Sequence, residues 1–121
     1  MCDAQLANVS MTNSNLTQAS LKGANLESAN LSKVNFTGAD LSGACLRKAN
    51  CQGAIFIDVL VHNLDIEGAK FQGAEFDVDA IPWDQIRNWR SAHFDKAVES
   101  RIIQRYGSLT FQKNRSSVQI K

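Results

Sequence analysis

The sequence contains no apolar run that could cross a membrane. Its 121 residues include no uninterrupted apolar stretch approaching the ~18 residues that a membrane-spanning helix needs. The N-terminus also lacks the basic stretch and apolar segment of a secretion signal. We therefore expect a cytoplasmic protein, with a mature lumenal or periplasmic form, its signal already removed, as the alternative.

The residues and motifs of common catalytic sites are scarce as well. The two histidines, His62 and His93, have no Cys or carboxylate neighbours at metal-ligand spacing. There is no GxGxxG, no Walker-type phosphate loop and no CxxC pair. We expect no catalytic residue, no cofactor and no metal, so that an enzyme with a hidden site is the least favoured function class.

Cysteine and net charge are also low. Cys2, Cys45 and Cys51 are too few for a disulfide framework, so we expect reduced thiols. The net charge is +1, with −4 in residues 1–80 and +5 in residues 81–121. This balance implies no electrostatic partner for the whole chain, and nucleic acid is not favoured as a partner.

What the sequence does contain is an unbroken period of five. Every fifth position over residues 6–76 is apolar. This period is neither helical nor that of a simple strand, so it predicts a repeat whose backbone turns at every fifth position and aims one side chain inward. The inward centres are Leu6, Met11, Leu16, Leu21, Leu26, Leu31, Phe36, Leu41, Leu46, Cys51, Phe56, Val61, Ile66, Phe71 and Phe76.

The other positions of the unit carry a pattern of their own. The residue two before each centre is usually small, the one directly before it is often Asn, Asp or Ser, and six of the seven glycines lie two after it. The segments ANLES, ANLSK, ADLSG, ACLRK, AKFQG and AEFDV resemble the A(D/N)LxX unit of the pentapeptide-repeat family. The resemblance covers about residues 4–78.

The resemblance implies an all-β solenoid. The family's fold is a right-handed quadrilateral β-helix with four pentapeptides per coil, so the units here make just under four coils. We assign residues 1–80 to this β-helix. Side chains four units apart then stack about 4.8 Å from one another, which predicts a column of Leu16, Phe36, Phe56 and Phe76 in the β-helix core.

The period ends after residue 76, and helical spacing follows. Pro82 suits the start of a short helix over 82–90, and Asp95 suits the N-cap of a second helix that ends before Gly107. We expect residues 81–107 to form a C-terminal helical cap over the open coil, with residues 108–121 as a flexible tail. An exposed aromatic platform for a partner is the alternative. The expected cap core is Trp83, Ile86, Trp89, Phe94, Val98, Ile102 and Tyr106.

Two surfaces are candidates for contact with a partner. Ile55, Ile57, Leu60 and Leu64 are apolar where most units are polar or small, which indicates a docking patch for a protein or a surface covered by the C-terminal segment. The N-terminal coil has no comparable cap. A homodimer through this end is therefore a hypothesis, beside cover by another molecule or by a longer chain.

The function that we expect is a non-enzymatic scaffold that binds another protein. The resemblance also implies a different class, because the best-understood family members protect DNA gyrase as long, acidic, dimeric rods that imitate duplex DNA. Such mimicry requires dense negative charge, about one per 1.7 Å of axis, whereas here lysines are interspersed among the carboxylates. A structural appendage of a larger protein is the third alternative.

Overall fold

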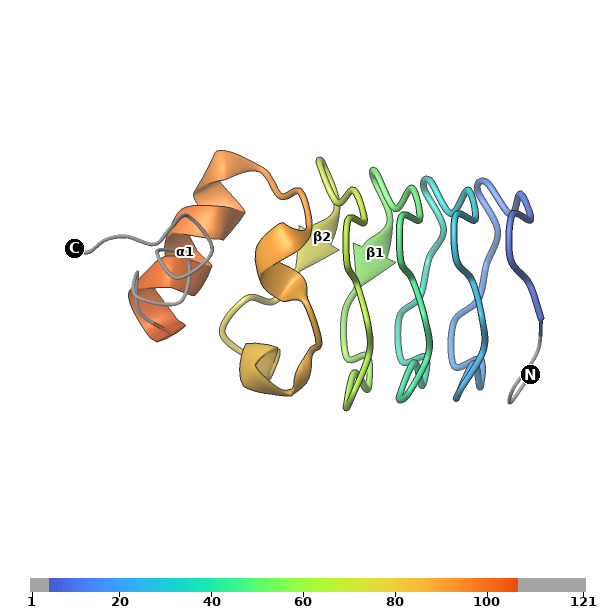
Figure 1. The fold of residues 1–121 in the computed structure, drawn as a ribbon, viewed down its shortest axis with the longest axis horizontal. Helices are drawn as coiled ribbons and strands as arrows, with labels where there is room; N and C mark the ends of the chain where they lie inside the picture. The colour runs from blue at the N-terminus through green and yellow to red at the C-terminus, as the bar shows by residue number, and fades with distance from the viewer. Residues whose placement is uncertain (1–4, 107–121) are drawn as a thin grey trace.

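The computed structural model describes residues 5–106 and shows a solenoid with a helical segment at its C-terminal end (Figure 1). Parallel bridges join residues that are 20 apart, such as Asn15 to Asn35 and Asn30 to Asn50. Four pentapeptide units therefore make one coil, and each coil is hydrogen-bonded to the next along the long axis of the molecule.

Each wall of a coil is so short that little of it counts as a strand. Only β1 (Ile55–Phe56) and β2 (Glu75–Phe76) extend beyond a single bridge in the described part of the chain, and they pair in parallel. The turns between walls share one conformation, because every residue two after an inward centre, from Asn8 to Gly73, has a positive φ of 57–74°. This region suits glycine, which explains why six glycines share that position.

The inward side chains form continuous columns. Phe36, Phe56 and Phe76 lie above one another, with ring centroids 5.0 Å and 5.3 Å apart and nearly parallel planes. The centres of the second coil, Leu21 to Phe36, are fully buried. The small residues two before the centres are buried beside them, since neighbouring walls leave room for little more than a methyl group.

The C-terminal segment differs in part from the expected pair of helices. A helix over 82–90 is wrong: the structure has two separate 3-10 turns, Trp83–Gln85 and Trp89–Ser91, followed by α1 (Lys96–Tyr106). Ile86 between the turns is extended and Asn88 is left-handed, with φ 64°. The reason is that Arg87 extends the coil ladder: its N–H donates to Leu64 and its carbonyl accepts from Ile66.

The side chains of this segment cover the last coil. Trp83, Ile86, Trp89, Phe94 and Ile102 are buried, whereas Val98 is half-buried. Phe94 stacks on Phe71 with centroids 5.3 Å apart, and the Trp83 indole donates to the Val78 carbonyl at 3.0 Å. The side chain of Tyr106 and the tail over residues 108–121 lie outside the described part of the chain.

Removing the middle ring of the phenylalanine column tests the interior. We expect Phe56→Ala to lower the free energy of unfolding by about 3–5 kcal/mol, because Phe56 is 3% exposed and its loss leaves a cavity between two rings. Urea denaturation measures the change. Leu60→Ala in the same coil is the control, with an expected change within about 0.5 kcal/mol because Leu60 is 58% exposed. Equal losses for the two variants contradict the assignment.

The two described cysteines should differ in reactivity. Burial raises the pKa of the Cys51 thiol, and the thiolate is the reactive form. We expect Cys51 to stay unmodified by iodoacetamide in the folded protein, while the half-buried Cys45 reacts. Peptide mass mapping with and without denaturant measures both rates. Rapid native alkylation of Cys51 shows that the column is open to solvent.

Candidate functional site

Three of the four residues of the expected patch lie around one corner of the solenoid. Ile55 and Ile57 flank the inward Phe56 on one wall, and Leu60 precedes the inward Val61 on the next. Residues next to an inward residue point outward because side chains alternate along an extended wall. Ile55 and Ile57 are half-buried, and Leu60 is 58% exposed.

Leu64 does not belong to this surface. The expectation that it is part of the patch is wrong, because Leu64 is 3% exposed and packs inside with Val61 and Ile66 around a cavity of about 10 Å³. Its position, two before the centre Ile66, faces inward throughout the repeat. We therefore define the wall patch as Ile55, Ile57 and Leu60. The described cap residues do not cover Leu60.

Three carboxylates lie next to the wall patch. Asp40 is bridged to Leu60 from the coil below, Glu75 pairs with Ile55 from the coil above, and Asp58 lies at the corner between Ile57 and Leu60. Hydrogen bonds from the Ser42 backbone N–H and hydroxyl lower the pKa of Asp40. This acidic rim was not found from the sequence, although stepping one coil backward or forward from the patch would have placed two of its members.

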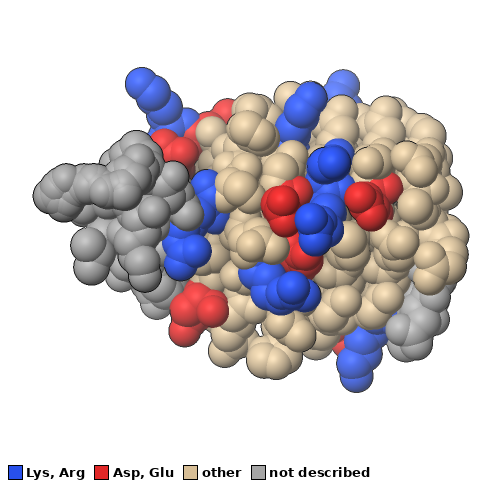
Figure 2. Space-filling view, viewed as in Figure 1, with Lys and Arg blue, Asp and Glu red and all other residues tan. Residues whose placement is uncertain are grey.

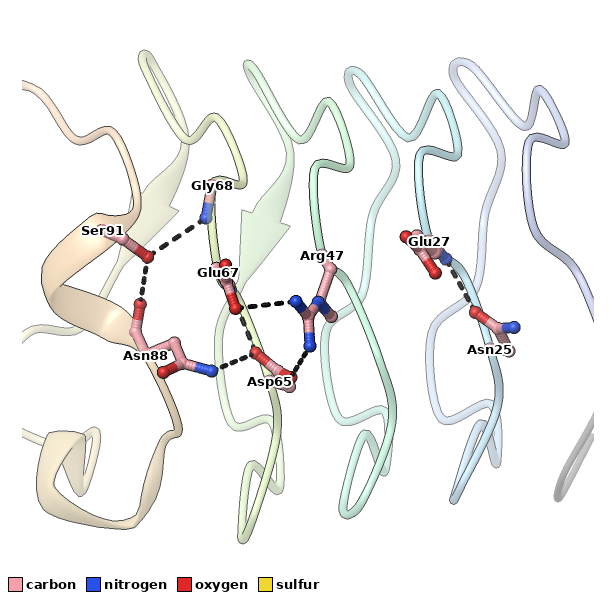
Figure 3. Close-up of polar contacts among 8 residues, drawn as sticks. All are labelled: Asn25, Glu27, Arg47, Asp65, Glu67, Gly68, Asn88 and Ser91. Atoms are coloured by element: carbon pink, nitrogen blue, oxygen red, sulfur yellow. Dashed lines mark hydrogen bonds and ion pairs between the residues drawn. The ribbon is translucent and has the colours of Figure 1, made fainter.

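A second polar cluster lies on another wall, in the middle of the face drawn in Figure 2, where basic and acidic side chains alternate along the long axis. Arg47 lies between carboxylates: its guanidinium is 2.9 Å from Glu67 Oε1 and 3.6 Å from Asp65 Oδ2 (Figure 3). Glu27 lies on the coil below. Exposed pairs of this kind contribute little to stability.

Asp65 differs from its neighbours because it is buried, at 5% exposed. Its Oδ1 accepts from the backbone N–H of Glu67 at 3.1 Å and from Asn88 Nδ2 at 2.9 Å (Figure 3). Asn88 is the left-handed residue of the C-terminal segment. The carboxylate thus joins the last coil to the segment that covers it.

At the C-terminal end of the ladder, side chains provide hydrogen-bond acceptors that backbone carbonyls provide in the lower coils. In the lower coils, the turn N–H donates to a backbone carbonyl of the next coil, as from Gly43 to His62. In the last coil, Gly68 N–H donates to Ser91 Oγ at 3.3 Å, and Gly73 N–H donates to Asp95 Oδ2 at 2.8 Å. The described segment over 82–95 therefore provides side-chain acceptors for two turn N–H groups of the last coil.

Within residues 5–106 there is no group of three His, Cys, Asp or Glu side chains that could hold a metal ion. His62 and His93 are both exposed, and His62 Nδ1 is 3.3 Å from Gln85 Oε1. Over the same residues, no helix has the length and apolar character to span a membrane.

The repeat geometry agrees with the comparison with protein families. The family described as Pentapeptide repeats matches residues 3–38 and 35–73, with eight copies of the repeat. The chain belongs to the pentapeptide-repeat family. A comparison with curated protein sequences found no match.

Two solved structures share the architecture. QnrB1, a plasmid-mediated fluoroquinolone resistance protein, is 14% identical at full length with a TM-score of 0.56, over 88% of this chain and 62% of QnrB1. A trypsin-treated QnrB1 variant is 19% identical with a TM-score of 0.61, over 81% of this chain and 46% of QnrB1. These likenesses show a right-handed β-helix, and this chain spans about half to three-fifths of QnrB1. The protein alr5209 from Nostoc Pcc 7120 is 28% identical over 77% of this chain and 78% of its own, with a TM-score of 0.44.

The Asp65 junction is testable by substitution. We expect Asp65→Ala to lower the free energy of unfolding by about 1–3 kcal/mol, because two partly buried donors lose a buried acceptor. Asp65→Asn should cost less, since its amide oxygen can still accept from both. Thermal unfolding followed by tryptophan fluorescence measures the change.

Glu67→Gln is the matched control on the same wall. It breaks only the exposed pair with Arg47, so we expect a change within about 0.5 kcal/mol. A loss as large as that of Asp65→Ala shows that the surface charge row, rather than the buried carboxylate, holds the C-terminal segment.

Proposed function

We propose that this pentapeptide-repeat protein is a non-enzymatic scaffold that binds another protein through the wall patch. The observation that carries the proposal is the exposure of Leu60, the one large apolar side chain described as exposed, at 58%. One neighbouring wall is built from short polar side chains such as Asn30, Ser32 and Asn50. An exposed apolar side chain beside two partly exposed isoleucines is typical of a contact site.

The rim indicates the chemistry of the partner. Asp40, Asp58 and Glu75 lie next to the apolar centre and place negative charge on part of its rim. Interfaces commonly combine an apolar centre with a polar rim, and opposite charges at the rim accelerate association and select the partner. The partner we propose therefore presents an apolar anchor flanked by lysine or arginine.

The flat walls also favour binding over catalysis. The interior is filled by stacked side chains, and the small apolar cavity under Trp83 has a volume of about 10 Å³, enough for about one water. A rigid surface is what the repeat supplies.

Imitation of DNA to protect a topoisomerase is the second candidate, supported by the fold shared with a fluoroquinolone resistance protein. Its requirement is a dense negative surface. Figure 2 shows basic and acidic groups interspersed on a largely uncharged face, and the described C-terminal segment carries Arg87, Arg90 and Lys96. A role as a structural appendage of a larger protein is the third candidate.

Affinity capture with matched variants tests the wall patch. We expect the double variant Ile57→Lys, Leu60→Lys to lose the captured partner, because lysine places charge in the apolar centre. The partner is then purified and titrated by calorimetry, where we expect at least about a 100-fold weaker dissociation constant. With the unchanged protein, affinity should fall as salt rises, because the acidic rim contributes.

The control variant Thr12→Lys, Gln52→Lys adds the same charge to another wall, where both residues are exposed. It should bind like the unchanged protein. Both variants should keep their melting temperature, since lysine stems can lie along the wall with the ammonium in water. Equal capture by both variants contradicts the wall patch, and protection of gyrase in a supercoiling assay favours DNA mimicry instead.

A further inference from the structure

A regular rung between two coils is made by one extended residue of the upper coil. On the wall of the phenylalanine column, Asn35 N–H donates to the Ser14 carbonyl, and the Asn35 carbonyl accepts from Leu16 N–H. Each wall of a coil therefore directs one carbonyl and one N–H toward the coil that follows. At the last coil, these two groups need partners from the C-terminal segment, because backbone groups beside a core are rarely left unpaired.

The C-terminal segment supplies the rung residue on two walls, through Arg87 and His93. His93 N–H donates to the Ala69 carbonyl, and the His93 carbonyl accepts from Phe71 N–H. The residues on either side of His93 are buried, and the second of them, Phe94, stacks on Phe71. A wall is thus covered by an extended tripeptide whose first and third residues are apolar.

No described residue forms this rung above β2. The Ala74 carbonyl and the Phe76 N–H are the equivalent groups of this wall, and within residues 5–106 no backbone group donates to the one or accepts from the other. The side chains show the same gap. Ala74 and Phe76 are half-buried. Their counterparts one coil below, Ala54 and Phe56, are 0% and 3% exposed. The edge of β2 therefore has room and hydrogen-bonding groups for an added strand.

The outward side chains near this edge are acidic. Glu75 lies on β2, Asp77 directly follows it, and Asp58 lies at the corner of the coil below, all three exposed. Within residues 5–106 none of the three forms an ion pair. Opposite charges on neighbouring strands stabilise the pairing of those strands. The strand that fits this edge therefore carries lysine or arginine.

Residues 107–121, which follow α1, contain a tripeptide with this pattern. Leu109 and Phe111 are apolar and flank Thr110, and threonine and phenylalanine favour extended structure. The segment has no Asp or Glu, and its charged residues are Lys113, Arg115 and Lys121. It therefore combines the apolar alternation of a rung with the charge that complements the edge.

The chain is long enough to return to this edge. Arg101 of α1 pairs with Asp79, three residues after β2, so the helix passes beside the turn that leaves this wall (Figure 1). From Arg101, α1 continues to Tyr106, about 7.5 Å farther at 1.5 Å per residue. The four residues from there to Thr110 span up to about 13 Å in extended form.

We propose that Leu109–Phe111 adds to the edge of β2 as a parallel strand of the same chain. Thr110 N–H then donates to the Ala74 carbonyl, and the Thr110 carbonyl accepts from Phe76 N–H. Phe111 packs over Phe76 and continues the phenylalanine column by one ring. The added strand closes an edge that is otherwise available to other chains. It uses the backbone edge rather than the wall patch, so it does not depend on the proposed function.

Amide hydrogen exchange in the full chain, followed residue by residue by NMR, tests the added strand. We expect Phe76 N–H to be protected and to show a nuclear Overhauser contact with Thr110. Phe111→Asp removes the apolar side chain that holds the strand, so exchange at Phe76 should become about tenfold faster, as for the loss of one hydrogen bond. Phe36 N–H, which donates to the Ile55 carbonyl, should keep its exchange rate and report that the solenoid is intact.

Ile120→Asp is the matched control, because it places the same charge in the same segment, outside the tripeptide. It should leave the protection at Phe76 unchanged. Asp77→Lys tests the acidic edge, and we expect about twofold to fivefold faster exchange at Phe76. Glu27→Lys makes the same change on another wall and should have no effect.

Three results overturn the proposal. The first is exchange at Phe76 N–H as fast as in an unfolded chain, and the second is protection that persists in Phe111→Asp. The third is protection that rises with protein concentration, which shows that a second copy fills the edge. Phe111→Asp leaves every residue of the wall patch in place, so capture of a partner by this variant tests the proposed function separately.

Discussion

The backbone ladder between successive coils is the constraint on which the rest of the structure depends. Each rung holds one wall about 4.8 Å from the next, so an inward side chain must pack on the side chain one coil earlier. This requirement places Phe56 between Phe36 and Phe76 and leaves a small space, filled by alanine in most units, for the residues two before each centre. The same ladder aligns the outward residues, so the surface chemistry is also arranged in columns.

The repeated part of this structure could be predicted from the sequence because a single period describes it. A period of five separates inward from outward residues, and a coil of four units places each residue above its equivalent. Leu64 shows where a prediction from residue type fails. A leucine is large for a position that alanine usually occupies, which suggests that it lies on the surface. Its position in the repeat is nevertheless an inward one, and the structure buries it.

The C-terminal segment could not be predicted to the same depth. The spacing of Trp83, Ile86 and Trp89 suits one face of a helix, but the same side chains can also cover a coil from an irregular backbone. The bridges that determine the path of this segment join Asp65 to Arg87 and Lys70 to His93. In both pairs the two residues are further apart in the sequence than one regular coil. No period predicts these offsets, because they depend on how the chain between positions 77 and 84 leaves and rejoins the ladder.

The interior of the repeat is nearly uniform, so it carries little information about function. A column of leucines and phenylalanines stabilises the solenoid whatever the solenoid binds. Specificity must then come from places where the pattern changes, such as an outward leucine at Leu60 or a buried carboxylate at Asp65. Because the ladder assigns each of these residues to a wall or an end, a change in the pattern identifies a surface. In a solenoid, therefore, the exceptions to the repeat are better guides to binding than the repeat itself.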